Sequence, residues 1–258
     1  MFLEKIQALQ KEEVARRKAA TSPFAMKEAM AHLPPPRDFL GSISLHKPLA
    51  LIAEIKPASP SAGVIQKDPD LPRIARQYQA GGAGGISVLT ERRFFHGDLA
   101  HLRQVKRETS LPLLQKDFVI DPFQIYEGRS AGADAILLIA ALLEKSQLED
   151  FGDLVRELGM VPWVEIHDEE DLEKISGLDF PLLGINNRNL KTLAVNLETT
   201  LRLKSRIPSG IRVISESGIR NSRDIHLLRE AGVDGVLVGE VLMREPNPAA
   251  KIRELLSL

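Results

Sequence analysis

Short apolar runs recur along this chain from residue 49 onward, and charged segments with helical periodicity separate them. The runs begin roughly every 20–35 residues, which leaves room for one helix between consecutive strands. Strands that alternate with helices in this way form parallel βαβ units, so the pattern predicts an α/β fold. The predicted strands are residues 49–56, 85–90, 113–116, 135–139, 162–166, 182–186, 212–216 and 235–239. The predicted helices include residues 72–80, 122–131, 148–158, 169–176, 197–204 and 223–231.

A short internal repeat supports this prediction. At residues 80–86, 131–136 and 231–236, a helical segment ends on glycine and a strand begins a few residues later. Eight strands, most of them followed by a helix, favour a closed (β/α)8 TIM barrel over an open doubly wound sheet. The length of 258 residues matches the roughly 250 residues of such a barrel. No Gly-x-Gly-x-x-Gly motif follows the first strand, so the main signature of a dinucleotide-binding fold is missing.

The segment before the first strand has helical rather than alternating periodicity. Its apolar positions, set among charged residues, are Leu3, Ile6, Leu9 and Val14. They predict a helix within residues 1–33, which the three prolines at 34–36 end, and residues 39–41 are expected to be irregular. Because this segment is too short for a core of its own, we expect an N-terminal helical extension over residues 1–48 and one catalytic barrel domain over residues 49–258.

The amino-acid composition excludes several classes of function. The net charge is −1, so nothing favours binding to nucleic acid or to an acidic membrane surface. The chain has no cysteine, which excludes disulfides and thiolate chemistry. No apolar run approaches the roughly 20 residues of a membrane helix, and the charged N-terminus does not resemble a signal peptide. We expect a soluble cytoplasmic protein that is a monomer or a weak homo-oligomer.

Neither the histidines nor the single tryptophan suggests a cofactor site. The six histidines show no metal-ligand spacing, so no metal is expected. We interpret His96, His101 and His167 as loop or surface residues, and Trp163 as a packing residue at the start of a strand.

The end of the first predicted strand carries two opposite charges. Residues two apart on a strand point to the same face, so Glu54 and Lys56 project together from an otherwise apolar run. Burying two ions costs several kcal/mol unless they pair or act on a ligand. A simple structural ion pair is the alternative. The Ser- and Gly-rich turn at residues 59–63 follows directly, and its N–H and O–H donors suit a phosphate.

Polar residues gather where the other predicted strands end as well. In a (β/α)8 barrel the active site is built at this edge. Lys116 and Glu165, like Lys56, each end a strand that is otherwise expected to be buried, which favours a functional role over a structural one. Asp117 is expected to anchor the following turn. The other polar strand-end residues are Asn186, Arg188, Glu216, Ser217 and Glu240.

Glycines mark a candidate phosphate site. Barrels of this class bind phosphate at the loops after the seventh and eighth strands. Gly218 and Gly239 stand at those positions, and a glycine allows backbone N–H groups to approach an oxyanion closely. Ser59 and Gly63, from the loop after the first strand, are expected to complete the phosphate site.

Several strings of residues run along the predicted barrel in a recognisable order. They are Ala53-Glu54-Ile55-Lys56, Ser59-Pro60-Ser61, Val88-Leu89-Thr90-Glu91, Phe94-Phe95-His96-Gly97, Lys116-Asp117-Phe118-Val119-Ile120-Asp121-Pro122, Gln124-Ile125-Tyr126-Glu127, Ala133-Asp134-Ala135-Ile136-Leu137-Leu138-Ile139, Val164-Glu165-Ile166-His167, Gly184-Ile185-Asn186-Asn187-Arg188-Asn189-Leu190, Glu216-Ser217-Gly218-Ile219 and Val238-Gly239-Glu240-Val241-Leu242-Met243. Together they resemble the indole-3-glycerol phosphate synthase family over the whole barrel. Pro57-Ala58 departs from this pattern, because many members carry a further basic residue there.

The resemblance implies ring closure of 1-(2-carboxyphenylamino)-1-deoxyribulose 5-phosphate, followed by loss of carbon dioxide and water, as in tryptophan biosynthesis. The only partner implied is this phosphorylated small molecule, and no cofactor is needed. Lys116 would protonate the ketone oxygen. Lys56 would pair with the substrate carboxylate or act as the acid in dehydration. Glu165 would act as base or stabilise charge on the anilino nitrogen. The division of roles among these three stays open.

The resemblance also assigns the remaining site residues. The expected catalytic residues are Glu54, Lys56, Lys116, Glu165, Asn186 and Ser217. The expected substrate-binding residues are Arg188, Glu216, Phe95, Phe118 and Leu137, of which the last three would enclose the aromatic ring. The expected phosphate ligands are Ser59, Gly218, Gly239 and, through its N–H, Glu240.

Three alternatives remain. A Schiff-base aldolase would use Lys116 or Lys56 as nucleophile, which requires a buried lysine with a lowered pKa. The sugar-phosphate isomerase of the same pathway needs a cysteine–aspartate pair, and this chain has no cysteine. A non-catalytic barrel would bind a phosphorylated ligand without turnover.

Overall fold

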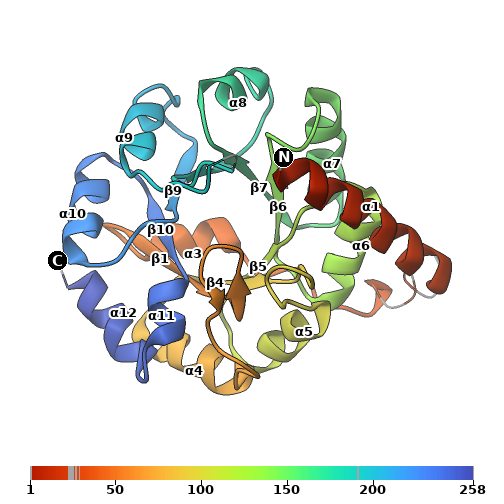
Figure 1. The fold of residues 1–258 in the computed structure, drawn as a ribbon, viewed down its shortest axis with the longest axis horizontal. Helices are drawn as coiled ribbons and strands as arrows, with labels where there is room; N and C mark the ends of the chain where they lie inside the picture. Colours follow the sequence, from red (N-terminus) through yellow and green to blue (C-terminus); the bar gives the residue numbers. More distant parts are fainter. Residues whose placement is uncertain (1, 23–25, 27, 29, 191, 258) are drawn as a thin grey trace.

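The computed structural model describes residues 2–22, 26, 28, 30–190 and 192–257. Parallel strands close into a barrel in the order β1-β10-β9-β8-β7-β6-β5-β4, and helices surround it (Figure 1). The sheet closes at β1, which pairs with β4 on one side and with β10 on the other. The barrel strands are β1 (Ala50–Ile55), β4 (Gly85–Leu89), β5 (Leu113–Lys116), β6 (Ala135–Ile139), β7 (Val161–Ile166), β8 (Leu182–Asn186), β9 (Arg212–Glu216) and β10 (Gly235–Val238).

The predicted (β/α)8 barrel is confirmed, and the predicted strand ends agree with the observed ones to within about one residue. The strands are buried almost throughout, as expected when one face fills the barrel and the other packs on helices. The surrounding helices are α4 (Leu71–Gly81), α5 (Leu99–Glu108), α6 (Pro122–Ala131), α7 (Lys145–Glu157), α8 (Glu169–Lys174), α9 (Glu198–Lys204), α10 (Ser222–Glu230), α11 (Glu240–Arg244) and α12 (Pro248–Leu256).

Local chemistry sets the helix ends. Asp70 and Asp121 cap the first turns of α4 and α6 by accepting backbone N–H groups. Gly82 and Gly132 end the same helices in the left-handed conformation, with φ of 93° and 95°. The two glycines lie in the first two copies of the repeat seen in the sequence, which therefore marks the ends of these two helices.

The prediction that residues 39–41 are irregular is wrong, because they form the start of helix α3 (Phe39–Leu45). Asp38 caps this helix through Gly41 N–H, a signal that the preceding prolines obscured. The Phe39 ring packs edge-on against Trp163, with ring centroids 5.8 Å apart. The helix lies at the amino ends of the strands.

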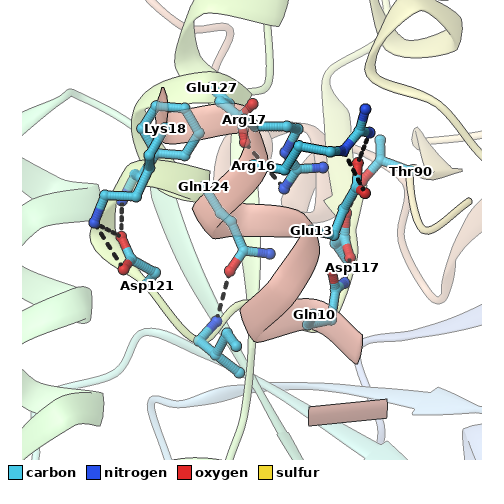
Figure 2. A network of polar contacts seen from close by, with 12 residues as sticks. Gln10, Glu13, Arg16, Arg17, Lys18, Thr90, Asp117, Asp121, Gln124 and Glu127 are labelled. Carbon is cyan, nitrogen blue, oxygen red and sulfur yellow. Dashed lines mark hydrogen bonds and ion pairs between the residues drawn. The ribbon is translucent and has the colours of Figure 1, made fainter. Parts of the chain in front are cut away.

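A second segment outside the barrel lies at the opposite rim. Helix α1 (Phe2–Ala20) crosses over α6, as Figure 1 shows. The polar contacts that hold it, drawn in Figure 2, are Gln10 with Asp117 (2.6 Å), Arg17 with Glu127 (3.2 Å) and Lys18 with Asp121 (3.0 Å). Because Asp117 adjoins Lys116 at the end of β5, α1 is anchored beside the carboxyl end of the barrel.

The loop after β1 contains a small hairpin that the sequence did not predict. It pairs β2 (Ala58–Ser59) with β3 (Gly63–Val64) in antiparallel fashion.

None of the described helices has the length and apolar content needed to cross a membrane.

Candidate active site

A cavity of about 450 Å³ opens at the carboxyl ends of the barrel strands. All of the expected catalytic and substrate-binding residues line it, as do all the expected phosphate ligands except Gly63. These residues are Glu54, Lys56, Ser59, Phe95, Lys116, Phe118, Leu137, Glu165, Asn186, Arg188, Glu216, Ser217, Gly218, Gly239 and Glu240. The structure thus brings together side chains from most of the strands, whereas the role of each one stays a prediction.

Lys116 lies at the centre of the charged part of this cavity. Its Nζ is 2.6 Å from Oε2 of Glu165 on β7 and 2.8 Å from Oε2 of Glu216 on β9. The Lys116 side chain is 14% exposed, while the two carboxylates are almost fully buried. Burial alone would lower the pKa of Lys116, but the attraction of Glu165, Glu216 and Glu54 outweighs it and raises this pKa above its ordinary value.

The pKa values of the two carboxylates around Lys116 are shifted in opposite directions. Burial acts to raise the pKa of Glu165, but Lys116 and His167 lower it well below the ordinary value. Burial raises the pKa of Glu216 to about 7; the attraction of Lys116 only partly offsets this, and repulsion from Glu165 and Glu54 adds to it. Glu165 is therefore ionised near neutral pH, whereas Glu216 takes up a proton more readily. Such divergence is typical of acid–base sites.

The Glu54–Lys56 pair predicted from the first strand is confirmed. Lys56 Nζ lies 2.8 Å from Oε1 of Glu54, and Ser87 Oγ on β4 approaches the other oxygen at 3.5 Å. Glu54 is buried, while the Lys56 side chain remains 19% exposed toward the cavity. Glu54 thus holds an ammonium group that a ligand can reach.

Trp163 has a polar role that sequence reasoning missed. The prediction that it packs in a strand is confirmed, because it is fully buried in β7. Its Nε1–H also donates to Oε1 of Glu216 at 3.0 Å. The period-two alternation that aligns Trp163 with Glu165 was the available signal for this inward orientation. Glu216 is therefore fixed from one side by Lys116 and from the other by Trp163.

Ser217 sits in a strained position between β9 and the next loop. Its φ of 67° lies in the left-handed region, which is uncommon for a residue with a side chain and is often found at functional sites. Asn187, a buried strand-end residue to which the sequence analysis gave no role, donates from Nδ2 to the backbone oxygens of Glu216 and Ser217. This amide holds the turn in place.

Glycines around the expected phosphate position are required by close packing. A Cβ on Gly239 would lie 2.5 Å from Oε1 of Glu54, and one on Gly218 would lie 2.5 Å from Val195. Ser59 Oγ accepts the N–H of Ala62, which fixes the first loop at this side. The expectation that Gly63 completes the phosphate site is wrong, because Gly63 pairs with Ser59 in the hairpin and does not line the cavity.

An apolar wall faces the charged groups. The rings of Phe95 and Phe118 lie with centroids 6.1 Å apart, and Leu137 of β6 lines the same cavity. Leu190, Leu193 and Val195 of the loop after β8 also line it, which the sequence analysis missed because loop residues carry no periodic signal. Opposed apolar and charged walls suit a ligand that is flat and aromatic at one end and anionic at the other.

Two expectations about neighbouring residues have different outcomes. Asp117 anchors the turn as predicted, because its Oδ1 accepts the N–H of Phe118 at 2.8 Å. His167 lies in a loop, as expected, but its side chain is only 8% exposed and its Nε2 lies 3.1 Å from Glu165, a contact that the sequence did not reveal. Among the described residues, no group of three or more His, Asp or Glu side chains is arranged to hold a metal ion.

Comparisons with known proteins agree with this geometry. The family model described as "Indole-3-glycerol phosphate synthase" matches residues 3–255. Among curated proteins, the indole-3-glycerol phosphate synthase of Desulforamulus reducens is 44% identical over 256 residues, covering 99% of this chain and 97% of that protein. The enzyme of the same name from Desulfotalea psychrophila is 46% identical over 258 residues, covering 98% of each.

Solved structures with lower sequence identity share the barrel alone. Thiamine phosphate pyrophosphorylase from Pyrococcus furiosus matches with a TM-score of 0.60 at 17% identity, covering 81% of this chain and 94% of that one. A 3-hexulose-6-phosphate synthase matches with a TM-score of 0.65 at 13% identity, covering 81% and 99%.

Proposed function

The chain belongs to the indole-3-glycerol phosphate synthase family, and we propose that the cavity at its barrel mouth carries out that reaction with Lys116, Lys56 and Glu165 in the reacting positions. The substrate would be 1-(2-carboxyphenylamino)-1-deoxyribulose 5-phosphate and the product indole-3-glycerol phosphate. One observation carries the proposal: two lysines and three carboxylates from the ends of β1, β5, β7 and β9 meet in one cavity beside an aromatic wall.

Lys116 is the proposed acid for ring closure. The ring carbon that bears the carboxylate attacks the ketone carbon, and the ketone oxygen takes a proton from the Lys116 ammonium group. The raised pKa of Lys116 keeps it fully protonated before the reaction. Because an alkoxide is a stronger base than an amine, the transfer becomes favourable as the carbon–carbon bond forms.

Lys56 is proposed to hold the substrate carboxylate during ring closure. Its ammonium group is directed by Glu54 at 2.8 Å and remains partly open to the cavity. Once carbon dioxide leaves, the electron pair of the broken bond restores the aromatic ring. Lys56 is then free to donate a proton to the departing hydroxyl group, so that it leaves as water.

Glu165 is proposed to stabilise the positive charge that develops on the anilino nitrogen and to accept the last proton. Lys116 lowers the pKa of Glu165 in the empty site, so this carboxylate is a weak base at first. When Lys116 has given up its proton, that attraction disappears and Glu165 becomes more basic. The order of steps thus follows from the pairing of these two groups.

The remaining residues are proposed to bind and orient the substrate. Phe95, Phe118 and Leu137 would enclose the aromatic ring. Asn186, Glu216 and Ser217 would hold the linker hydroxyls, and Arg188 would support the carboxylate. Ser59, Gly218, Gly239 and the N–H of Glu240 would bind the phosphate. We also propose a cytoplasmic location, since the substrate is a phosphorylated small molecule, and a monomeric or weakly homo-oligomeric state.

The Schiff-base alternative is disfavoured by the same ion pairs. A lysine nucleophile must be neutral, whereas Lys116 is held charged by two carboxylates. Borohydride reduction in the presence of a carbonyl substrate tests this alternative directly. A covalent adduct on Lys116 would support the aldolase and count against the synthase.

The proposed reaction is tested by mixing the purified protein with the carboxyphenylamino sugar phosphate and recording indole fluorescence. We expect a progressive rise in this signal, with release of one carbon dioxide per product. Tight binding without any fluorescence change between mildly acidic and mildly alkaline pH would instead support a non-catalytic barrel.

A further inference from the structure

His167 and Asp171 lie behind the Glu165 carboxylate and do not line the cavity. His167 directly follows β7 and lies two residues beyond Glu165, so the strand alternation places both side chains on the same face. Its Nε2 is 3.1 Å from Oε1 of Glu165, and its Nδ1 is 3.2 Å from Oδ2 of Asp171. Because His167 does not reach the cavity, it can act on the reaction only through Glu165.

Asp171 fixes the imidazole ring in this orientation. Its Oδ2 accepts the backbone N–H of His167 at 2.9 Å in addition to facing Nδ1. The backbone N–H of Asp171 is in turn donated to Oδ1 of Asp168, which caps α8 at 3.0 Å. The ring is thus tied to the first turn of α8 rather than left to rotate.

The two neighbours of the ring determine its protonation state. Both ring nitrogens face a carboxylate oxygen, and a neutral imidazole would direct a lone pair at one of them. Only the imidazolium form carries an N–H on both nitrogens; the contact of Nε2 with Glu165 is an ion pair by distance and not an aligned hydrogen bond. Burial lowers the pKa of His167, but the contacts with Asp171 and Glu165 and their charges raise it to about 9. The ring is therefore charged at neutral pH.

Other charged groups nearby are engaged elsewhere. Lys116, from β5, contacts Oε2 of Glu165 and not the oxygen that faces His167. Lys174, from α8, donates to the backbone oxygens of Ala140 and Leu143. Within the described part of the chain, the ion pairs of the imidazole are thus with Glu165 of β7 and Asp171 of α8.

We propose that His167 is a positioning residue for Glu165: an imidazolium group, oriented by Asp171, that holds Oε1 of this carboxylate and leaves Oε2 to Lys116. The inference rests on the proposed role of Glu165 and adds a partner outside the cavity. When Lys116 transfers its proton, Glu165 loses one cationic partner. His167 remains, so the carboxylate keeps its position and its charge at that stage of the reaction.

The kinetic test compares His167→Leu with His167→Gln. Removing the donor in His167→Leu should lower kcat about 10- to 100-fold, the size seen when the orienting partner of an active-site ligand is lost. KM should change by less than about twofold, because no substrate contact is removed. His167→Gln keeps an N–H near the position of Nε2 and should recover most of this loss. His32→Gln, at an exposed histidine, is the matched control and should behave as the wild type.

The pH dependence separates positioning from a merely structural role. In the wild type, kcat should fall as pH rises through about 9, where His167 loses its proton, and in His167→Gln this fall should be absent. NMR of the isotope-labelled histidine ring should show both nitrogens protonated at pH 7, independently of turnover. Superimposable pH profiles, a neutral ring at pH 7, or a KM that rises in step with the loss of kcat would overturn the proposal.

The wild type serves to distinguish this proposal from the proposed reaction. If the wild type gives no indole product, the proposed function fails. If the wild type turns over and folded His167→Leu does so equally well, the reaction stands and the positioning role is wrong. Circular dichroism of each variant identifies any that does not fold, in which case the His167→Gln profile and the NMR titration decide.

Discussion

Lys106 and Lys116 are both lysines paired with buried carboxylates, but they lie at opposite ends of the barrel. At the amino end, Lys106 Nζ lies 2.6 and 2.7 Å from the two oxygens of Asp134. Asp134 also accepts the backbone N–H groups of Arg37 and Leu113. The Asp134 carboxylate thus accepts hydrogen bonds from one ammonium group and two backbone amides. Neither Lys106 nor Asp134 lines the site cavity.

The carboxyl end is arranged differently. One ammonium group, that of Lys116, faces two carboxylates, and Glu54 adds further negative charge nearby. The result is opposite in sign: burial dominates and lowers the pKa of Lys106, whereas the attraction of Glu165, Glu216 and Glu54 raises that of Lys116. A buried ion pair alone does not indicate function, whereas a cluster of coupled charges with strongly shifted pKa values beside a cavity is typical of a functional site.

The largest effect should come from removing the lysine at the active end. Lys116→Met should reduce kcat by about 10³-fold or more, within the range for loss of a general acid. Steady-state fluorescence measures the loss, and binding of a phosphate-containing product analogue should remain largely intact. Retention of more than about a tenth of wild-type activity would contradict the assigned acid role.

The matched substitution at the opposite end should affect stability instead. Lys106→Met leaves the fully buried Asp134 without its ammonium partner and should destabilise the fold by about 3 kcal/mol, the low end for a buried pair because Lys106 is 20% exposed. Urea unfolding measures this value. The activity per folded molecule should equal that of the wild type. A fall in kcat without a loss of stability would contradict the purely structural role of Lys106.

Trp163→Phe tests the carboxyl end of the barrel further, because it removes one of the hydrogen bonds that hold the Glu216 carboxylate. The substitution removes the N–H that Glu216 accepts at 3.0 Å, so the ionised form is less stabilised and the pKa of Glu216 should rise further above about 7. We expect an acid-side limb in kcat/KM that moves to higher pH, with a loss of about tenfold or less near pH 7. An unchanged limb would show that Glu216 does not titrate in catalysis.

The smallest expected effect is the pH dependence of folding stability that His167 causes. The folded-state pKa of His167 is raised from 6.5 to about 9, so its stabilising contribution is fully present below about pH 6.5 and is lost as pH rises through about 9. Relative to His167→Gln, the wild type should lose thermal stability over this interval, with a fall in Tm of about 2–4 °C for each kcal/mol of stability lost in a chain of this size. Thermal unfolding at several pH values measures the difference. A constant difference would mean that the ring does not titrate there.

Much of the site was predictable because parallel strands place their carboxyl ends at one edge. Period-two alternation paired Glu54 with Lys56, and strand ends located Lys116, Glu165 and Glu216. The loop residues were predicted less well. Gly63 follows a Ser-rich turn as a phosphate ligand would, yet the hairpin turns it away from the cavity. Turn geometry depends on pairing that composition does not reveal.

The sequence by itself determined the barrel, its strand limits and the set of residues that share its mouth, because hydrophobic periodicity and strand direction are local properties. Only the tertiary structure decided which polar and charged side chains meet. Lys116 pairs with Glu216, 100 residues away along the chain, Trp163 donates a hydrogen bond to Glu216, and His167 pairs with Glu165. The physical reason is that Coulomb and hydrogen-bond energies depend on distances of a few ångströms between side chains. Closing the sheet sets those distances, and spacing along the chain does not.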